Sequence, residues 1–482
     1  MEENKRLACA AIDAVSAQIC EMSDAVWDVP ETAFLETEST RLQCELLEKL
    51  GFQVEKNLAN IPTAFSGRWG SGKPVIGILG EFDALAGLSQ KANCAVKEPI
   101  VSGGNGHGCG HNLLGAGAVA AAYGIKSYLE STGASGTVIY YGCPGEEGGS
   151  GKAFMARDGV FDELDFALTW HPMDYNVAWF ESTLANIQVS YKFTGVSAHA
   201  AAAPHLGRSA LDAVELMNVG VQFLREHIIQ EARVHYAITN TGGFSPNVVQ
   251  PTAEVLYLIR APKMNDVREI YERVNNIARG AAMMTDTKVD IQFVKSCSNF
   301  VPNTLIADEL HKNMELVGCP EYTEEELKFA REIRDSLDKK SNPMDTFVSK
   351  LRPDEVKWVR EQNIEPMANF MLPRIYSESS LPGSTDVGDV SWVCPTGQAV
   401  VASWPAGTPA HSWQAVAMGK HSIAHKSLLF AGKAIAATAI DLIENPELLE
   451  KAKEEHANRL DHKSYVSPIP KDIVPSAIGM KN

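Results

Sequence analysis

Four short apolar runs, each followed closely by polar residues, most constrain the fold of this chain. They are Val75 to Leu79, Thr137 to Tyr141, Phe166 to Trp170 and Ala399 to Ala402. Their length and composition are typical of buried strands. In an open parallel α/β sheet, ligands bind beyond the carboxyl ends of the strands, so polar groups from distant segments converge there. The sequence therefore predicts an α/β body with a functional site at one edge of its sheet.

The residues after these runs are of the types that hold metals. Glu81 and Asp83 follow the first run, the pair Glu146-Glu147 follows the second, and His171 follows the third. Cys109-Gly110-His111 lies between the first two runs, and His411 comes after the fourth. Thiolate, imidazole and carboxylate groups hold a catalytic metal and activate a water. We therefore predict a metal site. A purely redox or structural role for Cys109 is an alternative, but it would leave its neighbours without a shared purpose.

The glutamate pair lies in Pro-Gly-Glu-Glu-Gly-Gly, a flexible turn after a strand. Because such a turn lets two neighbours point to different partners, one glutamate can ligate a metal while the other moves protons. His107 also flanks Cys109, but we leave it out of the ligand set because a supporting or turn role explains it equally well. Helices are expected at Leu113 to Leu129, which is rich in Ala and Gly, and at Ser422 to Leu442.

A second domain is expected to interrupt the first. The segment from Asn186 to Lys295 has the β-α-β-β-α-β pattern of a ferredoxin-like unit. Its predicted strands and helices, in chain order, are Gln188 to Thr194, Arg208 to Ile229 (helix), Arg233 to Thr239, Glu254 to Arg260, Asp266 to Met284 (helix) and Lys288 to Phe293. Metal-type residues lie on both sides of it, so we predict a discontinuous catalytic domain (1–185 and 300–482) with an insert at 186–299. A charged helical segment, Thr323 to Glu365, is expected to be a solvated excursion.

The charge composition of the chain excludes some classes of binding partner. A chain of 482 residues carries 43 Lys plus Arg against 60 Asp plus Glu, a net charge of −17. That charge repels nucleic acid and anionic lipid, so small molecules are the expected partners. The first residues lack the features of a signal peptide, and no apolar stretch approaches the ~20 residues that span a bilayer, so a cytoplasmic location is expected. The nine cysteines show no disulfide-framework spacing.

These motifs resemble the aminoacylase and carboxypeptidase family of co-catalytic metallopeptidases, in the amidohydrolase branch that includes hippurate and auxin-conjugate hydrolases. The likeness covers nearly the whole chain. It is carried by Trp27 to Glu31, Gly80 to Leu88, His107 to Leu114, Gly142 to Gly151, Trp170 to Pro172, Ala198 to Asp212, Gly383 to Trp392 and Gly407 to Trp413.

The resemblance implies an α/β, mixed-sheet two-metal hydrolase domain with an inserted ferredoxin-like lid and dimerisation domain. Two divalent ions, manganese or zinc, would be held by Cys109, His111, Glu147, His171 and His411, with Glu146 as the general base. The insert would place His199 in the partner's active site to stabilise an oxyanion, in a homodimer or in a heterodimer with a related subunit. The implied reaction is hydrolysis of the amide bond of an N-acyl amino acid.

Two departures from the family pattern matter. Members outside this branch carry a ligand histidine two residues before the aspartate where this chain has Glu81, which leaves Asp83 to orient a ligand rather than bind metal. Many relatives have aspartate where this chain has Asn112, so a carboxylate beside the ligands is lost. In the insert, Asn247 and Arg260 are candidates for binding the substrate's carboxylates.

Two other functions fit the same residues. One is a broader N-acyl amino acid deacylase or a dipeptidase, with the same machinery and a different pocket. The other is a non-catalytic partner subunit of a heteromeric hydrolase. The complete set of predicted ligands together with Glu146 favours a catalytic chain over that second alternative.

Overall fold

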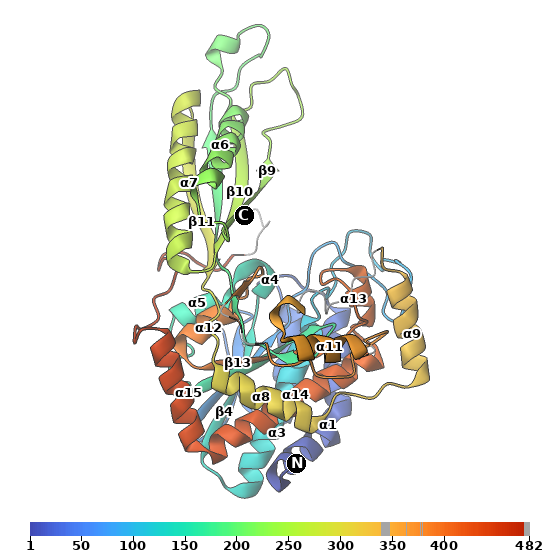
Figure 1. Ribbon diagram of the computed structural model, residues 1–482. Coiled ribbons are helices and arrows are strands. Elements are labelled where there is room, and N and C mark those ends of the chain that lie inside the picture. The colour runs from blue at the N-terminus through green and yellow to red at the C-terminus, as the bar shows by residue number, and fades with distance from the viewer. Residues whose placement is uncertain (339–347, 363, 376, 378, 477–482) are drawn as a thin grey trace.

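The computed structural model describes residues 1–338, 348–362, 364–375, 377 and 379–476. Figure 1 shows a large body built around a central sheet, with a smaller body that projects from one end of it. The smaller body holds the middle of the chain, so the large one is built from segments on both sides of it.

The large body contains a seven-stranded sheet of order β1-β2-β4-β3-β5-β13-β6. Its strands are β1 (Gln53–Lys56), β2 (Phe65–Ser71), β3 (Val75–Glu81), β4 (Gly136–Cys143), β5 (Phe166–Met173), β6 (Val177–Ala178) and β13 (Thr396–Ala402). The four central strands, β4, β3, β5 and β13, are parallel, and the flanking strands are antiparallel to their neighbours. Each of the four predicted strands is present, and the expectation of a mixed sheet is confirmed.

Helices cover both faces of this sheet. Alternate residues of β3 point to opposite sides: Ile76 and Ile78 join one core, and Val75 and Leu79 join another. The first core is closed by α1 (Glu3–Asp28), α2 (Thr37–Lys49), α3 (His111–Thr132), α8 (Thr304–Val317), α14 (Ser422–Glu444) and α15 (Pro446–Arg459). The second is closed by α5 (Gly151–Arg157) and α12 (Val387–Val393). No helix in the described part of the chain is long and apolar enough to cross a membrane.

Helix α3 packs closely against the sheet, as its Ala and Gly content predicts. A Cβ atom on Gly117 would lie 2.6 Å from Nε1 of Trp170, inside van der Waals contact. The Trp170 indole instead donates a hydrogen bond to the Leu114 carbonyl at 2.9 Å. This contact fixes the start of α3 against β5, and both elements carry predicted ligands.

The smaller body has the predicted ferredoxin-like fold. Its antiparallel sheet has the order β11-β8-β10-β9. Its elements are β8 (Ala185–Thr194), α6 (Ala210–Leu224), β9 (Arg233–Asn240), β10 (Thr252–Ala261), α7 (Met264–Thr285) and β11 (Lys288–Cys297). Both helices pack on one face and enclose a separate core. Helix α6 is shorter than expected at both ends: the Ser209 hydroxyl accepts the Asp212 N–H and starts the helix at Ala210, and a 3-10 turn over Arg225–His227 follows its last residue.

The charged segment after residue 323 is not simply solvated, so that expectation is wrong for its inner face. Helices α9 (Glu324–Asp335) and α11 (Pro353–Glu361) bury Ile333 and Val359 in a core with Trp404 and Ala406. The Arg334 guanidinium also donates to the Ala406 carbonyl. The segment therefore supports the loop between β13 and His411. Residues 339–347 and 363 of the segment lie outside the described part of the chain.

The close packing at Gly117 predicts how an alanine there would change the free energy of unfolding. Gly117→Ala should destabilise the fold by about 1–3 kcal/mol, since its Cβ would press on the Trp170 ring. Gly280→Ala is the matched control, because Gly280 also lies in a helix but has open space at its Cβ, so the higher helix propensity of Ala should stabilise by up to about 1 kcal/mol. Thermal unfolding followed by circular dichroism checks both, and equal effects would contradict the packing argument.

Candidate active site

The carboxyl ends of the parallel strands bring the predicted ligands together. The chain leaves β4 into the one-turn helix α4 (Glu146–Gly149), and β5 itself carries His171. Cys109 lies just before α3, and His111 is its first residue. His411 lies between β13 and α13 (Trp413–Met418). Figure 1 shows α4 at the end of the large body that faces the smaller one.

Two backbone conformations shape this edge. Gly110 has a φ of 73°, and a Cβ there would lie 2.8 Å from Pro172 Cγ, so only glycine fits between Cys109 and His111. His411 has a φ of 58°, a conformation that non-glycine residues rarely adopt. Its N–H donates to the Gly108 carbonyl at 3.0 Å, which ties the late loop to the Cys109 turn.

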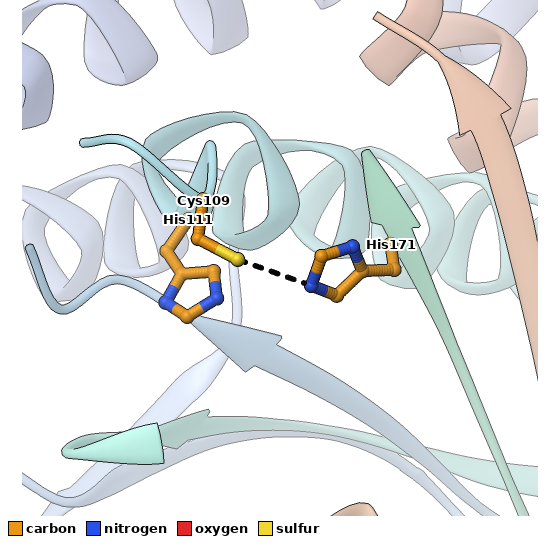
Figure 2. A group of neighbouring side chains, drawn as sticks. All are labelled: Cys109, His111 and His171. Atoms are coloured by element: carbon orange, nitrogen blue, oxygen red, sulfur yellow. Dashed lines mark hydrogen bonds between the residues drawn. The ribbon is translucent and has the colours of Figure 1, made fainter. Parts of the chain in front are cut away.

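In three pairs of side chains, atoms that can bind a metal face each other at short range. Cys109 Sγ lies 3.4 Å from His171 Nε2, and Figure 2 shows the sulfur and the imidazoles of His111 and His171 facing a common space. His411 Nε2 lies 3.1 Å from Glu147 Oε1, and His111 Nε2 lies 3.2 Å from Glu81 Oε2. Two ligands of one ion with bonds of about 2.0–2.3 Å have such separations when the angle at the ion is about 100°.

Asp83 orients two of these groups. Its Oδ1 accepts a hydrogen bond from His111 Nδ1 at 2.9 Å, and its Oδ2 accepts the Glu147 N–H at 2.9 Å. With Nδ1 occupied, His111 presents Nε2 to the site. A carboxylate behind a ligand histidine is a common support in metal centres, since it fixes the ring and raises its basicity.

The electrostatics favour a cation. Burial, reinforced by Glu147, raises the pKa of the Cys109 thiol well above its usual value, so a thiolate here needs positive charge beside it. Burial alone would lower the pKa of His111, but Cys109 and Asp83 raise it well above its usual value. Burial and the charge of His111 lower the pKa of His171 to about 4, so this ring is neutral, the form that ligates metal.

The pKa values of the two adjacent glutamates are shifted in opposite directions. Burial, with the charges of Glu81 and Glu147, raises the pKa of Glu146 well above its usual value. Although burial opposes it, the imidazoles of His411 and His111 lower the pKa of Glu147 to about 2. Glu147 is therefore anionic at neutral pH, and Glu146 is a stronger base than an ordinary glutamate. The predicted roles of Glu147 as a metal ligand and of Glu146 as the general base stay predictions.

The site also contains three residues that the sequence reasoning did not assign. Lys152 is fully buried, 2.7 Å from Glu81 Oε1 and 2.5 Å from Asp386 Oδ1. Glu81 ends β3 and lies two residues before Asp83, so the alternation of the strand could have placed it. Nothing in the sequence signals that Lys152 and Asp386 meet here, because they are 234 positions apart.

The residues present fit a metal centre. His111 Nε2, Glu147 Oε1 and Glu81 Oε2 are buried and make no hydrogen bond within the described part of the chain, which is costly unless a cation binds them. Donor atoms of Cys109, His111 and His171 lie within 4.8 Å of one another, and so do those of Cys109, Glu147 and His411. The two groups share the Cys109 sulfur. Neighbouring His107 instead contacts the Val26 carbonyl at 3.1 Å, and Asn112 donates to Ser23 and Gly419.

The candidate residues of the insert lie apart from this cluster. His199 and Asn247 are exposed and lie in adjoining loops, where the Ala200 N–H donates to the Asn247 carbonyl at 2.9 Å. The loop of His199 follows the far end of β8, a ten-residue strand about 30 Å long, and the loop of Asn247 leads into β10, whose Thr252 pairs with Thr194 at that same end. Arg260 lies at the opposite end, paired with Asn186, and donates to Ser384 Oγ of the large body at 3.4 Å. One subunit therefore does not gather all three at one point, and their roles stay predictions.

Together the fold and the cluster define a metal-dependent hydrolase of amide bonds. Residues 175–283 match the family profile described as a peptidase dimerisation domain. The chain is 49% identical to one of the subunits of p-aminobenzoyl-glutamate hydrolase from Escherichia coli, over 99% of this chain and 100% of that one. It is 30% identical to the Xaa-Arg dipeptidase of Mus musculus, over 97% and 95%.

The chain therefore belongs to the aminoacylase and carboxypeptidase family of metallopeptidases, as its motifs predict. The particular resemblance that these motifs also predict, to this same subunit of p-aminobenzoyl-glutamate hydrolase, is confirmed by the first relative. A solved structure, the aminobenzoyl-glutamate utilization protein of Klebsiella pneumoniae, superposes with a TM-score of 0.54 at 16% identity, covering 86% of this chain and 96% of that one. That structure supports the fold alone.

Bound metal should stabilise the folded chain, and part of this stabilisation should depend on Asp83, which orients the predicted ligands. Adding manganese or zinc to metal-depleted protein should raise its melting temperature, because only the folded state gathers the ligands. In Asp83→Ala the rise should be smaller, as His111 and the Glu147 backbone lose their partner. His425→Ala, which breaks an ion pair with Asp24, is the control. An undiminished metal response in Asp83→Ala, measured by differential scanning fluorimetry, would argue against the orienting role.

Proposed function

We propose that this chain hydrolyses the amide bond of p-aminobenzoyl-glutamate and releases p-aminobenzoate and glutamate. The observation that carries the proposal is the cluster of Cys109, His111, His171, Glu147 and His411, with Glu146 beside it, in a chain 49% identical to that hydrolase subunit over its whole length. A chain that only supported a catalytic partner would have no need for a complete set of ligands and a base.

Two divalent ions are proposed to bind at the paired groups. His111 and His171 would hold one, Glu147 and His411 the other, and the Cys109 sulfur would serve both. Thiolate favours zinc, while carboxylate and imidazole also accept manganese, so both metals are candidates. When bound, such ions lower the pKa of a water toward ~7 and polarise the substrate carbonyl.

Glu146 is the proposed general base. Its raised pKa suits both halves of the proton transfer, since it accepts a proton from the attacking water and later gives it to the leaving nitrogen. The bond that forms joins the water oxygen to the carbonyl carbon, and the bond that breaks is the amide C–N bond. The products are a carboxylic acid and the free amine of glutamate.

His199 is proposed to stabilise the oxyanion in the active site of a partner subunit. Its Nδ1 accepts the N–H groups of Ala201 and Ala202, at 3.2 and 3.1 Å. The ring proton is therefore on Nε2, which leaves an exposed donor for a developing negative charge. The position of His199 at the far end of the insert supports delivery to another subunit rather than to its own.

We propose that residues 186–299 form this lid and dimerisation domain, inserted between catalytic segments 1–185 and 300–482. The match to a peptidase dimerisation profile supports it. Helix α6 exposes Leu216, Val219 and Phe223 at helical spacing, and the neighbouring edge strand β9 exposes Tyr236 and Ile238. Such a continuous apolar face suits contact with a second subunit, either the same chain or a related one.

Carboxylate recognition is assigned to Arg260 and Asn247. Arg260 lies where the insert meets the large body, and its buried Nε has no hydrogen-bond partner among the described residues. A guanidinium with unused donors suits the glutamate carboxylates of the substrate. Asn247, beside His199, would contribute from the partner's lid.

Purified chain, loaded with manganese or zinc, should release glutamate from p-aminobenzoyl-glutamate. Glu146→Gln should lower kcat by about 10²–10⁴-fold, since it removes the proton acceptor and keeps the shape. The exposed Glu325→Gln is the control. Assays with acyl amino acids and Xaa-Arg dipeptides alongside test the second candidate function, which the 30% identity to a dipeptidase favours. Preference for a dipeptide would contradict p-aminobenzoyl-glutamate as the substrate, but it would still agree with an amide-bond hydrolase.

Subunit exchange tests the lid's role. Glu146→Gln and His199→Ala should each be nearly inactive alone. In a mixed dimer, one of the two sites would combine an intact Glu146 with an intact partner histidine, so a mixed dimer should recover about half of wild-type activity and an equal mixture of the two variants about a quarter. Differently tagged chains establish that mixed dimers form. If mixed dimers form without recovering activity, His199 does not act across subunits.

A further inference from the structure

A buried ion-pair network borders the metal ligands and takes no part in the mechanism above. It consists of Glu81 at the end of β3, Lys152 in α5 and Asp386 before α12. All three side chains are almost completely enclosed, with exposed fractions of 2%, 0% and 1%. Burying charged groups is costly, so a network of this kind needs a reason beyond stability.

Lys152 occupies only one oxygen of Glu81. The ammonium group lies 2.7 Å from Glu81 Oε1 and 2.5 Å from Asp386 Oδ1. Asp386 also accepts the backbone N–H of Lys152 at 2.8 Å through its other oxygen. The lysine is therefore fixed at both its backbone and its side chain, and it holds Glu81 in one orientation.

The other oxygen of Glu81 is aimed at the metal cluster. Oε2 lies 3.2 Å from His111 Nε2, yet neither atom makes a hydrogen bond to any residue that the structure describes. Both residues are buried, so water does not satisfy them in place of a partner. Two buried acceptor atoms that face each other at this distance repel, unless a cation or a proton lies between them.

The separation matches the other donor pairs of the site. It falls between the 3.1 Å of His411 and Glu147 and the 3.4 Å of Cys109 and His171. Donor atoms of Glu81, His111 and Glu146 also lie within 4.8 Å of one another. Glu81 is thus placed with respect to His111 as the proposed ligands are placed with respect to each other.

We propose that Glu81 is an additional metal ligand, which binds the ion that His111 holds, and that Lys152 is the residue that positions it. This inference rests on the proposed two-metal function. Carboxylate is a suitable fourth ligand for zinc and a favoured one for manganese. Lys152 keeps Oε1 from turning into the site, so Glu81 binds through Oε2 alone.

Metal content and affinity test this directly, without relying on activity. Wild type, Glu81→Gln and Asp386→Asn are depleted of metal, dialysed against buffered zinc or manganese, and measured by plasma mass spectrometry and chelator competition. Glu81→Gln keeps the size of the side chain and an oxygen for Lys152, but loses the anionic ligand. Asp386→Asn keeps a side-chain oxygen for Lys152, so Lys152 can still hold Glu81, but it removes one buried charge of the same network; it is the matched control.

The expected result is two ions per chain in wild type and in Asp386→Asn. In Glu81→Gln one ion should remain tight and the affinity for the other should fall at least about 10-fold. Circular dichroism checks the folding of each variant. Should Glu81→Gln not fold, Glu81→Asp keeps the charge, shortens the reach and should show the same selective loss.

Three results would overturn the proposal. Glu81→Gln that binds both ions as tightly as wild type would reduce Glu81 to a partner of Lys152 or a proton-sharing neighbour of Glu146. Equal loss in Asp386→Asn would mean that the network acts by charge balance rather than by ligation. Wild type that binds no metal would overturn the two-metal function as well, which separates that failure from the failure of Glu81 alone.

Discussion

Buried negative charge at the carboxyl edge of the sheet is the constraint on which this structure depends. Glu81, Asp83, Glu146, Glu147 and Asp386 gather there with the Cys109 thiol, and the buried Lys152 pairs with two of them, Glu81 and Asp386. Such a group repels itself in a low-dielectric interior. Divalent cations would offset this repulsion, and the same cations would supply the chemistry of amide hydrolysis. The binding of metal would therefore serve both the stability of the fold and its function.

The scaffold holds this edge through contacts from several elements. Parallel pairing sets Glu81 opposite Cys143, so β3 and β4 end side by side. Trp170 fixes α3 to β5, and the Glu36 carboxylate accepts the Gly145 N–H at 2.9 Å to hold the turn before Glu146. Helices α9 and α11 support the loop of His411 from outside. A rigid frame of this kind keeps ligands in place before metal arrives.

Much of this could be predicted from sequence, because strand ends and turn chemistry are local signals. The four strands, the ferredoxin-like insert and the approach of Cys109, His111, His171, Glu147 and His411 all follow from apolar runs and the polar residues after them. The pairing of Lys152 with Glu81 and Asp386 could not be predicted, since it depends on the packing of α5 against α12. The buried faces of α9 and α11 were also hidden, because their charged outer residues dominate the composition.

The insert shows a further limit of sequence reasoning. His199 and Asn247 lie in adjoining loops, but the length of β8 separates them from Arg260, which lies at the base of the insert. The motifs around each residue do not predict this separation, because it depends on how the strands pair along their length. It is the length of the strands that separates the candidate residues of the insert into two groups, one at its base and one at its far end.

Anomalous X-ray diffraction from metal-loaded crystals, recorded on both sides of the zinc or manganese edge, shows whether metal binds where the predicted ligands converge. We expect two anomalous peaks in each subunit at the carboxyl edge of the sheet, one between Cys109, His111 and His171 and one between Cys109, Glu147 and His411. No peak at this edge, or peaks only elsewhere in the molecule, would contradict this expectation.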